Sequence, residues 1–490
     1  MAQFGLCGGT YTSESPQIDA EECFNWYPEV PESPGAKTPI ALLPTPGKSL
    51  FSSLSGPSVR GEFFFQGMLF AVSGANFYQI TASGAATVLG TVQSDNNPIS
   101  WAAGPNQIVF TSGGGLYVWN FTTSTFSQVP TTTLFNQLPV IQVLYLDGFY
   151  VALFANSDAF QISNDDDGTT WPLTNVGEVS VYSDNVVGQI AAYRQIGFFG
   201  PKRSAFYYDA GAPLVPILPA SGAFIEQGCA APFSLCFMDN SIFWLGQDER
   251  GAGIMWRANG YTPQRVSTFA CEYAWSKYST IADAIAYTYQ EEGHTFLVLY
   301  FPTANATWVY DAATQLWHRR GFGTSSYTAD RSRCYAYAFG MHLVGDWATG
   351  NIYQQSIQIP TDFGNPILST RIAPTLTTEL DRMYHHRVQL DCETGLGPDQ
   401  IDGAGHDQAQ QIFMSFSNNC GKSWSNQQAR SLGKVGEYGK RVYWDRLGMA
   451  RQRTYKFTTT ARLRIANGYV RATPGYDTVE RVPAQVRKVS

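Results

Sequence analysis

Seven similar pairs of short strands follow one another between residues 67 and 355. In each pair, an alternating apolar run leads through a turn rich in Gly, Asn or Asp into a second run that contains an aromatic residue. This repeat is typical of the blades of a β-propeller, which are four-stranded sheets arranged around a channel. Successive aromatic residues lie 39 to 54 positions apart, and they are Tyr78, Tyr117, Phe160, Tyr207, Trp256, Tyr310 and Tyr353.

Burial gives this period a physical reason. A four-stranded blade leaves both of its faces partly apolar, and neighbouring blades around a common axis cover those faces. Helical patterns are almost absent from the chain. We therefore predict an all-β protein in which residues 61–360 form a β-propeller-like repeat array of six or seven blades, with one large β-sandwich as the alternative.

The regular spacing of strand patterns does not continue on either side of this array. After about residue 360 come an extended segment, a loop rich in Gly, Asp and Gln, a hairpin, and further strands with alternating arginines. We predict that residues 361–490 form a C-terminal β-sandwich-like module with a basic face. Residues 1–60 are predicted to form an N-terminal extended segment and docking arm.

Two stretches, SNDDDGTTW and SNNCGKSW, follow the turn pattern S-x-D-x-G-x-T-W, the first with one extra residue. The GKS ending of the second is not a phosphate-binding loop, because the glycine needed five residues before Gly421 is Phe416. In such Asp-box turns Asn or Asp bonds the turn, Gly takes the left-handed conformation and a buried Trp anchors the hairpin. The predicted structural residues are Ser163, Asp165, Gly168, Trp171, Ser417, Asn419, Gly421 and Trp424.

No catalytic set is visible in the sequence. Asp-box turns also occur in sialidases, so a propeller that binds or hydrolyses carbohydrate is the alternative function. The closest string to the arginine motif of sialidases, YRQI at 193–196, does not match it. The adjacent carboxylates Asp248-Glu249 and Glu291-Glu292 fall in hairpin turns, where solvated charge is the ordinary interpretation. We predict that the protein is not an enzyme.

Metal and cofactor sites are not expected either. The six histidines include no HExxH pair, and His385 and His386 would point to opposite faces of a strand. The run Asp165-Asp166-Asp167 lacks the alternating ligand spacing of a calcium loop. A turn rich in Asp is therefore favoured over a calcium site.

Composition indicates a soluble protein with many contacts. Charged residues make up 14% of the chain, against about 25% in typical domains, which suggests extensive contact with neighbouring subunits or partners. The eight cysteines form no CxxC pair and are expected to be free thiols in a reducing compartment. No signal peptide or membrane span is visible, so we expect synthesis in a cytosol and no membrane insertion.

The charge is unevenly distributed along the chain. Residues 430–490 contain 14 Lys and Arg against 4 Asp and Glu, whereas residues 1–429 contain 18 against 35. Such asymmetry indicates a docking surface, and a solvated strand face is the simpler alternative. Guanidinium groups suit carboxylates at a protein interface, with DNA phosphate as the competing target. The candidate interface residues are Arg441, Arg446, Arg451, Arg453, Arg462 and Arg464.

The N-terminal string CFNWYPEVPESPGAKTPIALLPTPGKSL (23–50) resembles the opening of the packaged-DNA stabilisation proteins of short-tailed bacteriophages, also called tail hub or nozzle proteins. The strings FGPKRSAFYYDAG (199–211) and PQRVSTFACEYAW (263–275) are similar to further family segments, although Ala205 and Phe206 depart from the usual residues. The C-terminal hairpin and arginine-bearing strands also follow the family, so the likeness covers about residues 20–470.

This resemblance implies a structural virion protein of the phage tail, assembled in the host bacterial cytoplasm. It implies a homohexameric ring below the portal and its adaptor (head completion) protein. Such a ring would close the DNA channel, retain packaged DNA that later passes through it, and give a platform for the tail needle and for tailspikes or tail fibres. The family has no known catalytic residues to carry over.

Overall fold

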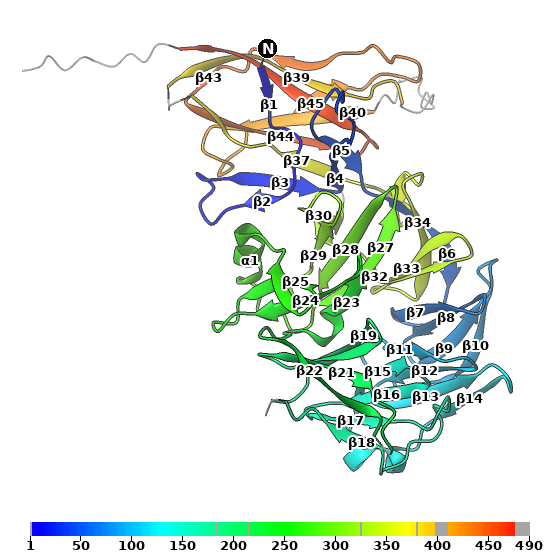
Figure 1. Cartoon of the computed structure of the whole chain (residues 1–490). Coiled ribbons are helices and arrows are strands. Elements are labelled where there is room, and N and C mark those ends of the chain that lie inside the picture. The colour runs from blue at the N-terminus through cyan, green and yellow to red at the C-terminus, as the bar shows by residue number, and fades with distance from the viewer. Residues whose placement is uncertain are drawn as a thin grey trace, which may run out of the picture. The chain divides into compact units, whose positions relative to one another are not determined.

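The computed structural model describes residues 2–181, 184–213, 215–323, 326–378, 381–396 and 410–475 (Figure 1). The chain divides into two compact units. One unit is formed by residues 45–368, and the other combines residues 1–44 with residues 369–490. The chain therefore begins in one unit, builds the whole of the other and then returns to the first.

Residues 45–368 form a β-propeller. Five of its sheets each consist of four antiparallel strands that are consecutive in the sequence, and a sixth set of four consecutive strands has the same order within a larger sheet. The first three sheets comprise β7 (Val59–Phe65), β8 (Met68–Ser73), β9 (Asn76–Ile80) and β10 (Ala86–Thr91); β11 (Trp101–Ala103), β12 (Gln107–Ser112), β13 (Gly115–Asn120) and β14 (Thr125–Gln128); and β15 (Val140–Leu146), β16 (Phe149–Phe154), β17 (Ala159–Ile162) and β18 (Val176–Glu178). The next three comprise β19 (Gly188–Ala192), β20 (Gln195–Phe199), β21 (Ser204–Asp209) and β22 (Ile217–Ile225); β23 (Cys236–Met238), β24 (Ser241–Gln247), β25 (Gly253–Asn259) and β26 (Thr262–Arg265); and β27 (Ile285–Glu291), β28 (His294–Phe301), β29 (Ala306–Asp311) and β30 (Leu316–Phe322).

A seventh sheet joins the two ends of this array. It contains β32 (Ser332–Ala338), β33 (Met341–Asp346) and β34 (Asn351–Ser356), and its fourth strand is β6 (Gly47–Ser53) from the start of the unit. β6 pairs antiparallel with β34, and β32 lies beside β7 of the first sheet. The short strands β35 (Thr361–Asp362) and β36 (Asn365–Pro366) extend this sheet beyond β6. The ring is therefore closed by a pairing between residues about 300 positions apart.

The aromatic residues that set the sequence period lie in the third strand of each sheet, as Tyr78 does in β9 and Tyr117 in β13. Apolar clusters fill the junctions between neighbouring sheets. Tyr78, for example, packs in a cluster with Leu343 and Ile352 of the seventh sheet. This burial between sheets is the physical reason for the period, and the prediction of a β-propeller is confirmed. Helical structure is limited to α1 (Phe269–Trp275) and the 3-10 turns η1 (Thr131–Thr133), η2 (Phe135–Gln137) and η3 (Pro232–Ser234) in the described residues, and one further short strand is β31 (Thr328–Ala329).

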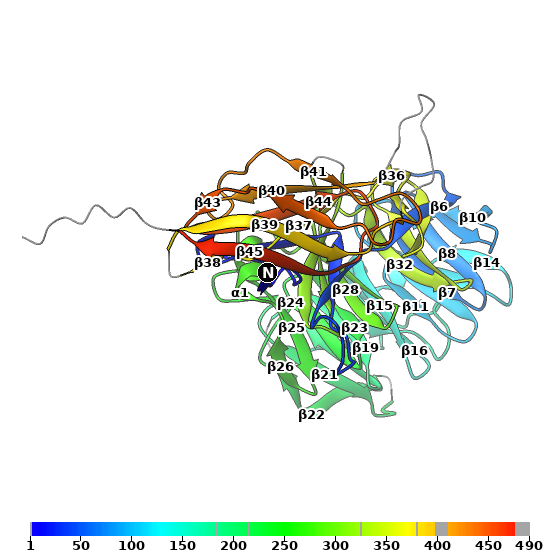
Figure 2. The ribbon, with the colours of Figure 1, turned by 90° about the horizontal axis from the view of Figure 1, so that it is seen from above.

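The other unit is a β-sandwich, as predicted for the C-terminal part of the chain. One sheet has the order β4-β5-β45-β39-β42 with β1 and β43 at its side, and the other contains β3-β37-β44-β40-β41 with β2 and β38 (Figure 2). Trp26, Trp444 and Tyr455 belong to the apolar core of this unit. The strands are β1 (Ala2–Phe4), β2 (Tyr11–Thr12), β3 (Ala20–Phe24), β4 (Trp26–Glu29), β5 (Ala41–Pro44), β37 (Ser369–Ile372), β38 (Leu376–Thr377), β39 (Met383–Cys392), β40 (Gln411–Ser417), β41 (Gln428–Ser431), β42 (Val442–Asp445), β43 (Met449–Ala450), β44 (Gln452–Thr459) and β45 (Ile465–Pro474).

The predicted domain boundaries need correction. Residues 1–60 are not a separate docking arm, because β1 to β5 are part of the sandwich and β6 is part of the propeller. Trp26 is fully buried and its indole N–H donates to the Leu463 carbonyl at 2.9 Å. The N-terminal strands thus complete the sandwich core, and residues 361–368 belong with the propeller rather than with the C-terminal module.

A buried lysine lies at the point where the ring closes. Lys48 of β6 pairs with Asp330 at 2.7 Å and with Asp362 at 3.2 Å, and all three side chains are buried. Burial alone would lower the pKa of Lys48, but the two carboxylates raise it above its ordinary value. Burial raises the pKa of Asp362 to about 6, whereas Lys48 and its hydrogen bonds hold the pKa of Asp330 below its ordinary value.

Replacing this lysine should weaken the closure of the ring. Lys48→Met leaves two buried carboxylates without a cation, which we expect to cost about 3–5 kcal/mol of unfolding free energy. Lys202→Met changes an exposed lysine of the same unit and should alter stability by less than about 0.5 kcal/mol. Urea unfolding followed by tryptophan fluorescence measures both, and equal midpoints for the two variants would contradict this role.

The stability of the propeller should also depend on the protonation of Asp362. Its pKa of about 6 in the folded protein lies above the ordinary value of 3.8 for an aspartate, so its stabilising contribution is present at low pH and is lost as the pH rises through 6. Relative to Asp362→Asn, the wild type should therefore lose about 2 kcal/mol between pH 4.5 and pH 7.5. Unfolding midpoints of both proteins across this range test the prediction, which parallel pH profiles would refute.

Candidate functional site

The propeller surrounds a central channel that forms its main candidate binding site. A cavity of about 580 Å³ is lined by residues from the innermost strand of each of the seven sheets or from the segment leading into it. Representative lining residues are Arg60, Trp101, Gln142, Gln189, Leu235, Tyr287 and Arg333. This volume lies within the range of about 300–1,000 Å³ that small-molecule sites occupy.

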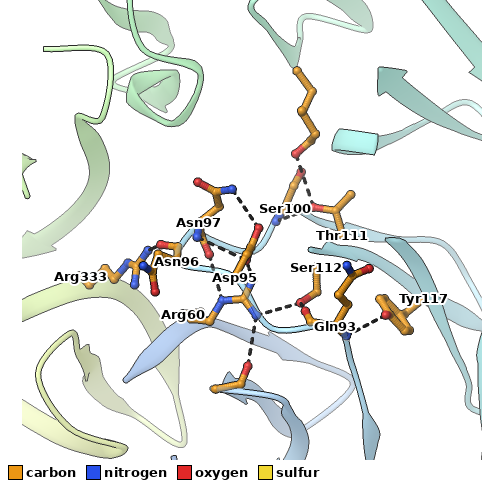
Figure 3. A network of polar contacts seen from close by, with 12 residues as sticks. Arg60, Gln93, Asp95, Asn96, Asn97, Ser100, Thr111, Ser112, Tyr117 and Arg333 are labelled. Atoms are coloured by element: carbon orange, nitrogen blue, oxygen red, sulfur yellow. Dashed lines mark hydrogen bonds and ion pairs between the residues drawn. The ribbon is translucent and has the colours of Figure 1, made fainter. Parts of the chain in front are cut away.

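Arg60 of β7 organises one end of this channel (Figure 3). Its side chain is 1% exposed and donates to the carbonyls of Asn97 and Gly74 at 3.1 Å and to Ser112 Oγ at 2.8 Å. It also forms an ion pair with Asp95. Burial and, to a smaller extent, the nearby Arg333 together lower the pKa of Arg60 to about 10. These bonds fix the segment that connects the first sheet to the second.

Arg333 of β32 approaches the same segment from the seventh sheet and donates to the Asn96 carbonyl (Figure 3). Ser100 continues the network, because its hydroxyl donates to the Val143 carbonyl of the third sheet at 3.0 Å. Four sheets of the ring are therefore tied together around residues 93–100. Burial lowers the pKa of Arg333 below its ordinary value.

Glu62, two residues after Arg60 on β7, is buried beside the thiol of Cys334. Burial raises the pKa of this carboxyl well above its ordinary value. Burial in the channel wall therefore favours the protonated form of Glu62 over the charged form.

Exposed aromatic side chains gather next to the channel. A second cavity of about 590 Å³ is lined by Phe237, Tyr335, Tyr337 and His342, among others. Phe237 and Tyr337 are 42% and 56% exposed. The Tyr335 hydroxyl lies 2.9 Å from Nδ1 of His342. This groove offers exposed aromatic rings beside polar groups, which is a surface suited to binding.

The first Asp-box turn has the predicted buried tryptophan but differs from the prediction at two other positions. Gly168 does not take the left-handed conformation, which Asp166 adopts instead with φ of +50°. Trp171 is 2% exposed and donates to the Gly168 carbonyl at 2.7 Å, and it packs in the cluster between the second and third sheets. The buried Ser163 hydroxyl accepts from the Tyr150 amide. The carboxylate that bonds the turn is that of Asp167, which accepts from the Thr169 amide at 2.9 Å, and not that of Asp165. The extra residue in this copy shifts the position of the acceptor.

The second turn also has the expected bonds. Asn419 Oδ1 accepts from the Ser423 amide at 2.9 Å, and Gly421, with φ of +85°, donates to the Ser417 hydroxyl. Trp424 is only half-buried, with the Lys456 ammonium 4.4 Å from its ring centroid. Trp424 is therefore less buried than Trp171, and its turn leads from β40 to β41 at the edge of the sheet.

The six candidate interface arginines do not all reach the surface. Arg441, Arg446, Arg451 and Arg464 are exposed and Arg462 is half-buried. Arg453 is 1% exposed, donates to the Leu447 carbonyl and lies 4.3 Å from the Phe416 ring centroid. Arg453 is therefore a structural residue. Arg464 is paired with Glu393 at 3.2 Å, so its charge is partly compensated within the unit.

Asp248, Glu249 and Glu292 lie in hairpin turns as expected, whereas Glu291 is the last residue of β27 and is half-buried. Asp248 accepts from the amides of Arg250 and Ala252, and Glu291 accepts from the Ile357 amide. Within the described ranges, no three His, Cys, Asp or Glu side chains are grouped so that they could hold a metal ion. In the same part of the chain, no helix is long and apolar enough to cross a membrane.

Sequence analysis missed the Arg60–Arg333 network and the ion cluster of Lys48. A signal for the first was present, because the string VRGEFFF (59–65) places Arg and Glu on one face of a strand that is otherwise apolar. The partners of Lys48 lie 282 and 314 residues away. No local pattern could have identified them.

The fold and these sites define a class of protein, a β-propeller combined in one chain with a β-sandwich that carries exposed arginines. Two family models match the chain: the one described as "Bacteriophage P22 Gp10, beta-propeller" matches residues 2–359, and the one described as "Bacteriophage P22 Gp10, beta-sandwich" matches residues 370–473. The chain belongs to this family of phage structural proteins, the DNA stabilisation proteins similar to P22 Gp10.

Comparison with solved structures finds only weak similarity. The WD40 β-propeller domain of Doa1 is 10% identical over 65% of this chain and all of that chain, with a TM-score of 0.41. The extracellular domain of BT4673 from B. thetaiotaomicron is 10% identical over 84% of this chain and 58% of that chain, with a TM-score of 0.43. Similarity at this level carries no argument about function. No curated protein matches the chain.

The different burial of the two Asp-box tryptophans gives a direct test of their roles. Trp171→Ala removes a fully buried ring and should cost about 3–5 kcal/mol of unfolding free energy. Trp424→Ala removes a half-buried ring and should cost about 2 kcal/mol. Denaturant unfolding of each variant measures the losses, and a loss at Trp424 as large as that at Trp171 would contradict the difference in burial.

Proposed function

We propose that this protein forms a homohexameric ring in the tail of a short-tailed phage, below the portal and its adaptor protein. The ring closes the DNA channel, retains packaged DNA until ejection, and gives a platform for the tail needle and for tailspikes or tail fibres. The observation that carries this proposal is the family match, which covers the propeller and the sandwich in one chain. Assembly takes place in the host cytoplasm.

The exposed arginines of the sandwich are the proposed docking residues. Arg441 and Arg446 flank β42, and Arg451 precedes β44. Residues 1–429 of the chain carry 35 acidic against 18 basic residues. Guanidinium groups bind carboxylates with defined geometry, so the sandwich would dock on an acidic surface of the neighbouring subunit or of an adjoining tail protein.

The alternative function, a propeller that binds or hydrolyses carbohydrate, finds support only in the aromatic groove at Phe237 and Tyr337. Family membership favours the structural role, since both units match a phage structural protein. A glycan array with the purified protein distinguishes the two. Binding that is lost in Tyr337→Ala would favour the carbohydrate function.

Reversing the charge of the docking residues should block assembly. The triple variant Arg441→Glu, Arg446→Glu, Arg451→Glu places acidic groups against an acidic partner, and each disrupted pair costs about 2–5 kcal/mol when it is buried in the interface. We expect incorporation into particles to fall by roughly ten-fold or more, with heads that leak DNA. Quantitative immunoblotting of purified particles and packaged-DNA measurements give the readout.

A matched control carries the same charge change on the propeller. Lys202→Glu, Arg250→Glu and Lys277→Glu alter three exposed basic residues of that unit, and this variant should assemble normally. If the sandwich variant assembles as well as the control and only DNA retention or ejection changes, the arginines contact DNA and the docking assignment is wrong.

A further inference from the structure

The propeller channel contains a buried positive charge that the described residues do not neutralise. Arg333 lines the channel and is 8% exposed. Its only hydrogen bond within the described residues is the one from Nη2 to the neutral carbonyl of Asn96. Its Nε is buried without an acceptor. A guanidinium group has five N–H donors, so most of the donors of Arg333 remain available.

The charged groups around Arg333 do not supply the missing anion. Asp95 lies in this network and is paired with Arg60. Burial raises the pKa of Glu62, on the same strand as Arg60, well above its ordinary value, which disfavours the charged form of this carboxyl. Tyr300 and Cys334, which interact electrostatically with Arg333, are neutral, because burial raises the pKa of Tyr300 to about 12 and that of Cys334 well above 9. Among the described residues, no carboxylate forms an ion pair with Arg333.

An isolated buried charge is unfavourable unless a counter-ion pairs with it. The channel offers the space, because the cavity that Arg333 lines has a volume of about 580 Å³. The side-chain amides of Gln142 and Gln189, also in the wall, donate to carbonyls of the chain and do not compensate the charge. The planar fork of a guanidinium matches two oxygens of a carboxylate or phosphate.

We propose that the propeller channel binds a small oxyanion, a phosphate or a carboxylate, through the free donors of Arg333. The anion would neutralise the cation that joins the seventh sheet to the segment between the first and second sheets. This inference does not depend on the proposed tail function, since it concerns the propeller of a single chain.

Calorimetric titration of the full-length protein tests the proposal. Inorganic phosphate and acetate are titrated separately, in chloride buffer of constant ionic strength, into the wild type and into Arg333→Gln. We expect one anion per chain in the wild type and at least a ten-fold weaker affinity in the variant. Arg194→Gln, which changes an exposed arginine paired with Asp147, should bind as the wild type does.

The two anions distinguish the source of the ligand. Tighter binding of phosphate assigns a phosphate ligand, and tighter binding of acetate assigns a carboxylate such as the end of a peptide chain. If Arg333→Gln does not fold, the wild-type melting temperature gives the second measurement, because a ligand of the folded state raises it as its concentration increases. Absence of both binding heat and a melting shift, or equal affinity in a folded Arg333→Gln, would overturn the proposal.

Discussion

The pairing of β6 with β34 is the contact on which the propeller depends. Each sheet buries its two faces only against neighbours, so an open array would leave an apolar face at each end exposed to water. The strand that closes the ring comes from residues 47–53, directly after the last N-terminal strand of the sandwich. The closing strand also carries Lys48, whose buried charge is compensated only when the segments that bear Asp330 and Asp362 are in place. Closure is therefore specified by charge as well as by backbone pairing.

Much of the propeller could be predicted from sequence because its signal is local and repeated. Tyr78 and Tyr117 mark the third strand of successive sheets, and the Asp-box at Trp171 forms a tight turn within a few residues. Contacts between distant parts of the chain gave no such signal. The sequence predicts an extended arm for the N-terminal strands, because their partners lie far away in the chain. The partner of β1, for example, is β45, which lies more than 400 residues away.

The alternation of arginine with apolar residues correctly predicted the exposure of only some of the candidate interface arginines. The pattern correctly predicted exposure of Arg441 and Arg464. It failed at Arg453, which is buried against Phe416 and held by a backbone carbonyl, because a long side chain can satisfy its donors inside a sheet as well as at its surface. Arg60 in the propeller is likewise buried with its donors satisfied inside the fold. Its guanidinium group connects Asn97 and Gly74, which lie in segments that do not pair with each other as strands. Arginine in this chain thus has two roles, one structural within the units and one proposed at their surface.

The central functional claim is that six copies of this chain surround the DNA path of a phage tail. Cryo-electron microscopy of the particle that contains the protein, reconstructed without imposed symmetry at the tail vertex, measures this most directly. The account predicts six propeller–sandwich chains in one ring below the portal and its adaptor, with the exposed arginines of each sandwich at a protein interface. A single copy per tail, a ring of another symmetry, or density for this chain away from the DNA path would contradict it.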